Sequence, residues 1–136
     1  MVSIDCSDCK KHCCGDIKEL RPIMMPWEED IFEEFCDMIK KPSHDMLVLK
    51  RKSDGNCIFL DGKAVKCKIY DERPLECRIY PLLLKFPDGK LSVVVDKRFC
   101  KNLSRLKFDE KKVLSELKKN MFSKDWIDGF NDMVGF

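Results

Sequence analysis

Nine cysteines are the residues of this 136-residue chain best suited to chemistry, because thiols form disulfides, bind metals and act as nucleophiles. The first residues carry no basic and apolar leader, and no apolar run approaches the roughly 20 residues that span a bilayer. We therefore expect a cytoplasmic protein that does not enter the membrane. Stable disulfides are rare in that compartment, and an odd number of cysteines does not suit a disulfide framework. Metal binding is the leading interpretation.

Eight of the cysteines stand at spacings that suit metal ligands, and Cys36 lies apart from them. A Cys-x2-Cys pair places two sulfurs on one tight turn. Adjacent cysteines point in different directions, so Cys13 and Cys14 should serve different ions, or different irons of one cluster. Eight thiolates make two sets of four, and four thiolates complete either a closed zinc site or a cubane cluster. The predicted ligands are Cys6, Cys9, Cys13, Cys14, Cys57, Cys67, Cys77 and Cys100.

The spacing favours an iron–sulfur cluster of the 4Fe-4S type over zinc. Zinc sites are usually built from pairs of short knuckles, whereas this chain has one Cys-x2-Cys and later gaps of nine residues. The irons of a cubane lie at separate corners and accept ligands from distant loops. Zinc remains the alternative, and one cluster plus one zinc also fits the count. His12 could be a ligand or an outer donor, and His44 is expected at the surface.

Net charge and the absence of known motifs bear on two other functional classes, nucleic-acid binding and enzymatic catalysis. A net charge of +2 with mixed signs argues against a nucleic-acid partner. The sequence has no phosphate-binding loop, nucleophile elbow or His-Glu-x2-His helix, and thiol exchange has little support, so an enzymatic reaction is left open. Five basic residues each adjoin a predicted ligand and could neutralise a cluster, or could reflect a lysine-rich composition: Lys10, Lys66, Lys68, Arg78 and Lys101.

The elements that must position these cysteines are short. A helix is predicted from Trp27 to about Lys40, and its apolar face would bury Ile31 and Cys36, so that Cys36 only packs. The other predicted elements are a strand over 46–49, a turn over 53–56 that leads into Cys57, a strand over 58–60 with a turn at 61–62, a loop with one helical turn over 67–78, a hairpin over 82–96, and helices over 109–122 and 124–134.

These elements predict an α+β fold: a small, irregular, metal-stabilised domain with short hairpins, one central helix and two C-terminal helices. We expect a single domain over 1–136, with a ligand-bearing region at about 6–100 and a helical part at about 103–136. The apolar content is thin for a chain of this length. Metal that closes long loops would supply the missing stability.

Three motifs carry a resemblance to a known family: Cys6-x2-Cys9-x3-Cys13-Cys14, Gly55-x-Cys57-x-Phe59-Leu60, and Cys67-x-Ile69-Tyr70-x2-Arg73-Pro74-x2-Cys77-Arg78-x-Tyr80-Pro81. The chain resembles the YkgJ-type cysteine-cluster family, described as zinc- or iron-chelating. Cys100 is similar to a trailing family cysteine, although here it precedes Lys101 and not Pro-Gly. The resemblance implies metal or cluster binding. It also reaches flagellin lysine methylases, which contain a related domain.

Two functions of different classes follow. The first is an iron–sulfur protein that transfers electrons, senses redox state or serves as an accessory subunit. The second is a zinc-stabilised module that acts through a protein partner. The methylase resemblance adds a cluster-bearing accessory to a protein-modifying enzyme, which would need a separate catalytic partner.

Overall fold

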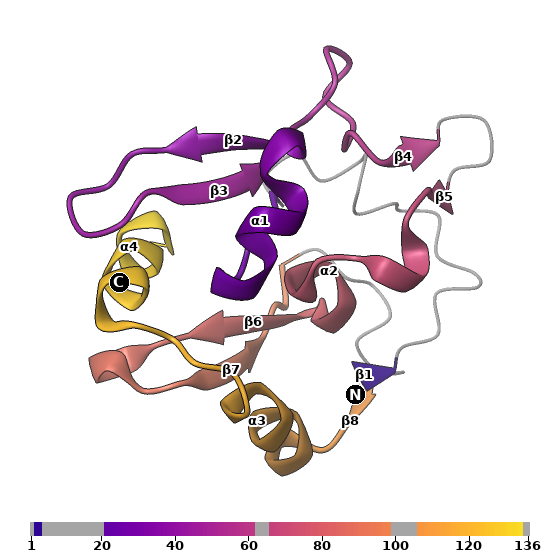
Figure 1. Ribbon diagram of the computed structural model, residues 1–136. Helices are drawn as coiled ribbons and strands as arrows, with labels where there is room; N and C mark the ends of the chain where they lie inside the picture. Colours follow the sequence, from indigo (N-terminus) through magenta and orange to yellow (C-terminus); the bar gives the residue numbers. More distant parts are fainter. Residues whose placement is uncertain (1, 4–20, 62–65, 99–105, 135–136) are drawn as a thin grey trace.

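Short antiparallel strand pairs and short helices alternate along the chain, in the α+β class expected from the sequence (Figure 1). The computed structural model describes residues 2–3, 21–61, 66–98 and 106–134. Within these ranges each strand pairs with one other strand. The pairs are β1 (Val2–Ser3) with β8 (Lys107–Phe108), β2 (Cys36–Ile39) with β3 (Met46–Leu49), β4 (Leu60–Asp61) with β5 (Lys66–Cys67), and β6 (Leu82–Lys85) with β7 (Ser92–Val95).

The predicted central helix is shorter than the sequence suggested. It consists of η1 (Pro26–Glu28), α1 (Glu29–Phe32) and η2 (Glu33–Phe35), and it ends before Cys36, whose φ of −121° and ψ of 152° are extended. Cys36 therefore lies on a strand and not on a helix. Pairing of β2 with the wholly buried β3 overrides the helical pattern of 36–40. Ile31 is 66% exposed, so its predicted burial is also wrong.

The segment 21–25 lies along the other edge of β3. The amide of Met24 donates to the carbonyl of Leu47 over 2.8 Å, and the amide of Leu49 donates to Pro22 over 3.0 Å. Ile23 forms a single bridge with Val48. All four residues of β3 are buried, so the strand is covered on both faces and reads in the sequence as a continuous apolar run.

The C-terminal half follows the prediction closely. The 82–96 hairpin is confirmed, with Asp88 and Gly89 at φ of 54° and 76° in its turn. Helices α3 (Glu110–Lys118) and α4 (Lys124–Val134) are also confirmed, and the Asp109 carboxylate caps α3 by accepting from the Lys111 amide over 3.0 Å. Helix α3 ends at Lys118, before the predicted end at 122, and Met121 beyond it is 90% exposed.

Two groups of buried side chains hold these elements together. The larger, here the major core, lies between the β2–β3 and β6–β7 hairpins, with α2 (Leu75–Ile79) and α4 between them and α3 packed against β7 (Figure 1). Its buried members are Ile23, Met25, Met46, Val48, Leu75, Ile79, Leu82, Leu84, Phe86, Val93, Val113, Leu117, Trp126 and Phe130. The smaller, here the minor cluster, consists of Met24, Phe32, Cys36, Leu47, Leu49, Cys57 and Leu60.

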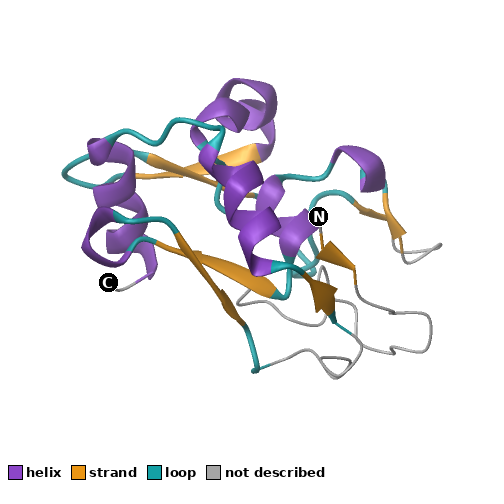
Figure 2. Cartoon of the chain, turned by 90° about the horizontal axis from the view of Figure 1, so that it is seen from below, coloured by secondary structure: helices purple, strands orange, loops and turns teal. Residues whose placement is uncertain are grey.

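Helix α4 approaches the β2–β3 turn very closely. A Cβ atom at Gly129 would lie 2.8 Å from the backbone oxygen of His44 and 2.9 Å from the sulfur of Met46, so only glycine fits there. The short pairs β1–β8 and β4–β5 lie at the opposite end of the molecule from the C-terminus (Figure 2). Within the described ranges, no helix is both long and apolar enough to cross a bilayer.

Candidate metal centre

Three of the eight predicted ligands fall within the described residues: Cys57, Cys67 and Cys77. The predicted ligands Cys6, Cys9, Cys13, Cys14 and Cys100, together with His12, lie outside those residues. Cys36, Cys57 and Cys67 are free thiols. The described part of the site is therefore a set of three cysteines contributed by three different segments of the chain.

The predicted turn delivers Cys57. The amide of Lys52 donates to Asn56 over 2.7 Å, and the Asp54 carboxylate accepts from the Asn56 amide over 2.9 Å, with Gly55 at φ of 90°. The turn returns the chain so that Cys57 bridges Arg51. Cys57 is buried in the minor cluster.

Main-chain hydrogen bonds connect Cys57 to Cys67. Ile58 and Phe59 form a turn and not the predicted strand, and the Leu60 amide donates to the Cys57 carbonyl over 3.0 Å. Leu60 in turn pairs with Cys67 across β4 and β5. Leu60 therefore connects Cys57 with Cys67, ten positions later, by a hydrogen bond to the first and strand pairing with the second.

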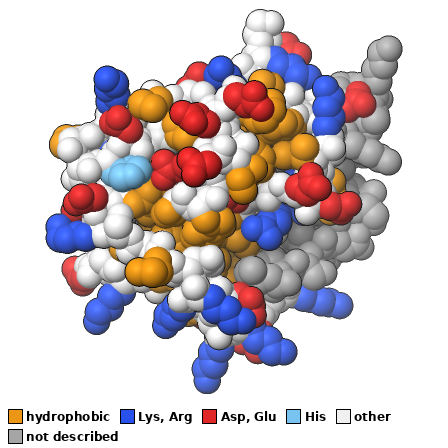
Figure 3. All heavy atoms as spheres, in the orientation of Figure 1, with side chains coloured by type: hydrophobic (Ala, Val, Ile, Leu, Met, Phe, Trp, Pro, Cys, Tyr) orange, Lys and Arg blue, Asp and Glu red, His pale blue; other side chains and the backbone are white. Residues whose placement is uncertain are grey.

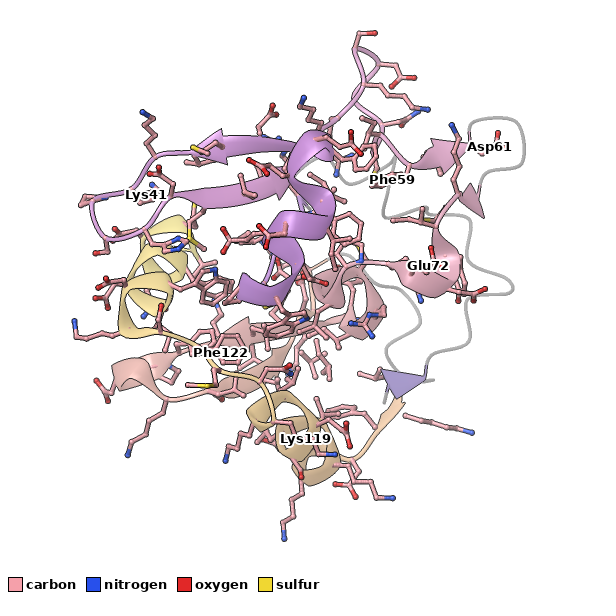
Figure 4. The ribbon with its side chains drawn as sticks, viewed as in Figure 1. Lys41, Phe59, Asp61, Glu72, Lys119 and Phe122 are labelled. Atoms are coloured by element: carbon pink, nitrogen blue, oxygen red, sulfur yellow. The ribbon has the colours of Figure 1, made fainter. Side chains whose placement is uncertain are left out.

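Arg73 braces the loop that carries Cys77. Its Nε donates to the carbonyl of Tyr70 in η3 (Tyr70–Glu72) over 2.8 Å, and its guanidinium lies 4.0 Å from the Tyr70 ring centroid. Another guanidinium nitrogen lies 3.5 Å from the Cys77 carbonyl. In Figure 4, Glu72 of this loop lies on the same side of the molecule as Phe59 and Asp61.

A second brace connects the end of α2 to the end of β7. The Tyr80 hydroxyl donates to Asp96 over 3.2 Å, and Arg98 donates to both oxygens of the same carboxylate over 3.0 and 3.1 Å. Burial alone would raise the pKa of Asp96, but the Arg98 guanidinium and these hydrogen bonds hold it below its ordinary value. Arg98 is two positions before Cys100. Sequence reasoning missed Asp96 because its partner Tyr80 is distant in the chain.

The buried Glu28 and the partly buried Glu76 are acids that sequence reasoning also missed. Glu28 ends η1, and both its oxygens are occupied: by the Met25 amide over 2.9 Å and by the Leu75 amide over 2.8 Å. Glu76 accepts from the Ile23 amide over 2.5 Å. Burial raises the pKa of both, that of Glu76 to about 7 with a further contribution from the charge of Glu28.

Cys36 and His44 are not arranged as ligands in the described residues. Burial raises the pKa of Cys36 to about 11, so its thiol stays protonated at neutral pH. His44 is half-buried, with Nδ1 2.6 Å from the Asp45 carbonyl, and is therefore less exposed than predicted. Beside it, acidic side chains line a hollow of about 290 Å³ (Figure 3).

Within the described ranges, no three side chains of the His, Cys, Asp or Glu types lie close enough to hold a metal ion. Cys57, Cys67 and Cys77 therefore do not form a complete centre on their own. Their chemistry still fits a thiolate-bound zinc or iron centre, since all three side chains offer a sulfur donor. Of the cations that could neutralise such a centre, the described side chains Lys68 and Arg78 are exposed next to Cys67 and Cys77.

Comparison with known proteins agrees with this chemistry. The sequence model of the family CxxCxxCC, described as "Putative zinc- or iron-chelating domain", matches residues 5–113, which include all eight predicted ligands. The chain is similar to the uncharacterized protein MJ0661 of Methanocaldococcus jannaschii, with 48% identity over 52 residues. That segment is 36% of this chain and 29% of the relative, so the chain spans less than a third of the relative's length. No solved structure matches.

Proposed function

Because the chain belongs to the CxxCxxCC family of zinc- or iron-chelating domains, we propose that its eight predicted cysteine ligands form the metal site and that the site holds an iron–sulfur cluster of the 4Fe-4S type, which takes four thiolates. Membership in the family supports metal binding in general. The more specific part of the proposal is that the metal is iron in an iron–sulfur cluster. The proposed ligands are Cys6, Cys9, Cys13, Cys14, Cys57, Cys67, Cys77 and Cys100.

One observation carries this proposal: three separate segments hold Cys57, Cys67 and Cys77 on a framework of main-chain and arginine hydrogen bonds. Such bracing suits ligands that must keep a fixed orientation, because the protein controls a metal centre partly through the groups around its ligands. The remaining ligands would come from the residues before Arg21 and from those after Arg98. The structural support for the proposal comes from the described residues.

Ligand chemistry and spacing favour iron–sulfur over zinc. The donor set is all sulfur, with one Cys-x2-Cys and two gaps of nine residues, which suits the separated irons of a cubane. A bound cluster would supply one-electron redox chemistry. The chain's own residues would hold it, limit its contact with water and set its charge environment through Lys68 and Arg78. We therefore propose a role in electron transfer, or as an accessory module.

The proposal places the chain in the cytoplasm, where thiolate ligands remain reduced. It also treats residues 1–136 as a single domain, because buried side chains from Ile23 to Phe130 share the major core. Whether a partner supplies a reaction is a separate matter. The matched relative is longer than this chain, which is compatible with a module that works beside another domain.

Anaerobic purification, followed by metal and acid-labile sulfide analysis and a visible spectrum, tests the proposal. We expect a brown protein that contains iron and sulfide and that bleaches in air. Stoichiometric zinc without iron in protein from its native host would refute the cluster and support the second candidate, a zinc-stabilised interaction module. The family description favours that candidate equally, since it names both metals. Absence of every metal would refute both.

A further inference from the structure

We propose that Glu28 and Glu76 form a carboxylate clasp that positions the Cys77 helix for metal binding, an inference that rests on the proposed function. The two side chains act in opposite directions across the same junction. Glu28 accepts from the backbone of Leu75, and Glu76 accepts from the backbone of Ile23. The clasp thus joins the segment 23–28 to the first turn of α2 by two bonds that each span about 50 positions of sequence.

The burial of Glu28 shows that it does more than start a helix. It is 4% exposed, whereas the neighbouring acids Glu29 and Asp30 are partly or fully exposed. A helix-start carboxylate needs only the local bond to Met25, yet the second oxygen of Glu28 is committed to Leu75. Two acids placed near one another, one buried and one partly buried, are costly, because desolvation disfavours their charges and like charges repel. Hydrogen bonds from the backbone amides of Ile23, Met25 and Leu75 offset part of that cost, so we attribute the acids to positioning.

The clasp positions helix α2, which is too short to be stable on its own. Helix α2 has five residues, far fewer than an isolated helix needs to be stable in water. Its apolar side chains Leu75 and Ile79 enter the major core, but such packing is not directional. The bond from the Leu75 amide to Glu28 is directional, and it acts two residues before the Cys77 sulfur.

The other side of the clasp is firmly held. The segment 23–28 is hydrogen-bonded to β3 through Met24, and it begins two residues after Arg21, which donates to the Leu49 carbonyl over 3.1 Å. Arg21 is seven positions after Cys14 in the sequence. The clasp therefore ties Cys77 to the anchored segment that follows the N-terminal cysteines. Its loss should weaken metal binding by more than it weakens the fold.

Titration of the reduced, metal-free full chain with Co²⁺ tests this inference, because thiolate-bound Co²⁺ absorbs visible light. In Glu28→Gln an amide NH2 group replaces one carboxylate oxygen, and this group cannot accept a hydrogen bond from a backbone amide. We expect the dissociation constant for Co²⁺ to rise about 10-fold, as for other residues that orient metal ligands. Val113→Ala is the matched control. It removes a buried side chain of the major core, so it should lower the melting temperature and leave the dissociation constant unchanged.

Glu76 provides the conservative comparison. Glu76→Gln keeps a carbonyl oxygen for the Ile23 amide and should bind Co²⁺ like the unmodified chain, whereas Glu76→Ala should bind about 10-fold more weakly. Equal affinities for these two variants would overturn the clasp, even if Glu28→Gln failed to fold. So would a Glu28→Gln affinity no lower than that of Val113→Ala. Failure of the unmodified chain to bind any metal would instead refute the proposed function.

Discussion

The major core and the minor cluster differ in what completes them. The major core has 14 buried residues from every part of the described chain, including an aromatic group in which Phe86 lies 5.9 Å from Trp126 and 5.4 Å from Phe130, measured between ring centroids. The minor cluster has seven buried residues, and two of them are cysteines. The adjoining strands β4 and β5 have two residues each. Apolar packing completes the major core, while the minor cluster includes Cys57, a predicted ligand.

This difference explains why the apolar content looks thin. Most large apolar side chains serve the hairpins and helices far from Cys57, as the position of Phe122 relative to Phe59 shows in Figure 4. The ligand region keeps few of them. A two-residue strand pair is not stable alone in water, so the cysteine side needs another source of stability. We expect metal to supply it.

Metal removal should produce the largest effect on stability, and it should affect the region around the predicted ligands more than the major core. Chelation under reducing conditions is expected to speed amide exchange in residues 57–61 and 66–72, while β6, β7 and α4 stay protected. Structural metal sites in the smallest domains contribute on the order of 10 kcal/mol to folding, so local protection should collapse. Hydrogen exchange measured by mass spectrometry checks this. Equal loss of protection in both regions would contradict the proposed difference between the major core and the region around the predicted ligands.

Aromatic truncation should be more costly in the major core than in the minor cluster. Phe130→Ala is expected to lower the free energy of unfolding by about 3–5 kcal/mol, because Phe130 is 1% exposed and packed on all sides. The matched variant Phe32→Ala should lose less, since its partly exposed neighbours Phe35 and Phe59 can close around the space. Denaturant unfolding of the metal-free protein measures both. A larger loss for Phe32→Ala would reverse the comparison.

Asp96→Asn should destabilise the protein by about 2 kcal/mol, because the buried carboxylate accepts bonds from Tyr80 and Arg98. Its folded pKa lies below the unfolded value, so the charged form is favoured by folding. The contribution is therefore complete above about pH 4 and is lost as pH falls through the folded pKa. Acid titration should show a shallower loss of stability in the variant than in the original chain. Removing the exposed Lys119–Glu116 pair by Lys119→Met, as a control, should cost less than about 0.5 kcal/mol.

Cys36→Ala should have the smallest effect, about 1 kcal/mol, because it removes one buried sulfur from the minor cluster. Its metal content should be unchanged, whereas Cys57→Ala in the same cluster should lose metal. In the folded chain the Cys36 thiol should react with alkylating reagents only slowly, since burial raises its pKa to about 11. Mass spectrometry after alkylation and metal analysis of both variants check this. Loss of metal from Cys36→Ala would place it among the ligands.

The sequence predicted elements best where local signals agree. The 82–96 hairpin combines alternating apolar residues with a Pro-Asp-Gly turn, and α4 combines a clear helical register with a good length. The prediction failed where strand pairing overrides the local pattern. Residues 36–39 have a helical pattern but form a strand, because they pair with the buried β3.

By itself, the sequence determined the α+β class, the family, the set of candidate ligands and the packed role expected for Cys36, because these depend on residue types and on short-range periodicity. Only the tertiary structure decided that Glu28 reaches Leu75, that Glu76 reaches Ile23 and that Tyr80 reaches Asp96. A carboxylate reads the same in a sequence whether it faces water or a distant backbone amide. The energy of burying it, which makes its partner obligatory, arises only once the chain has folded.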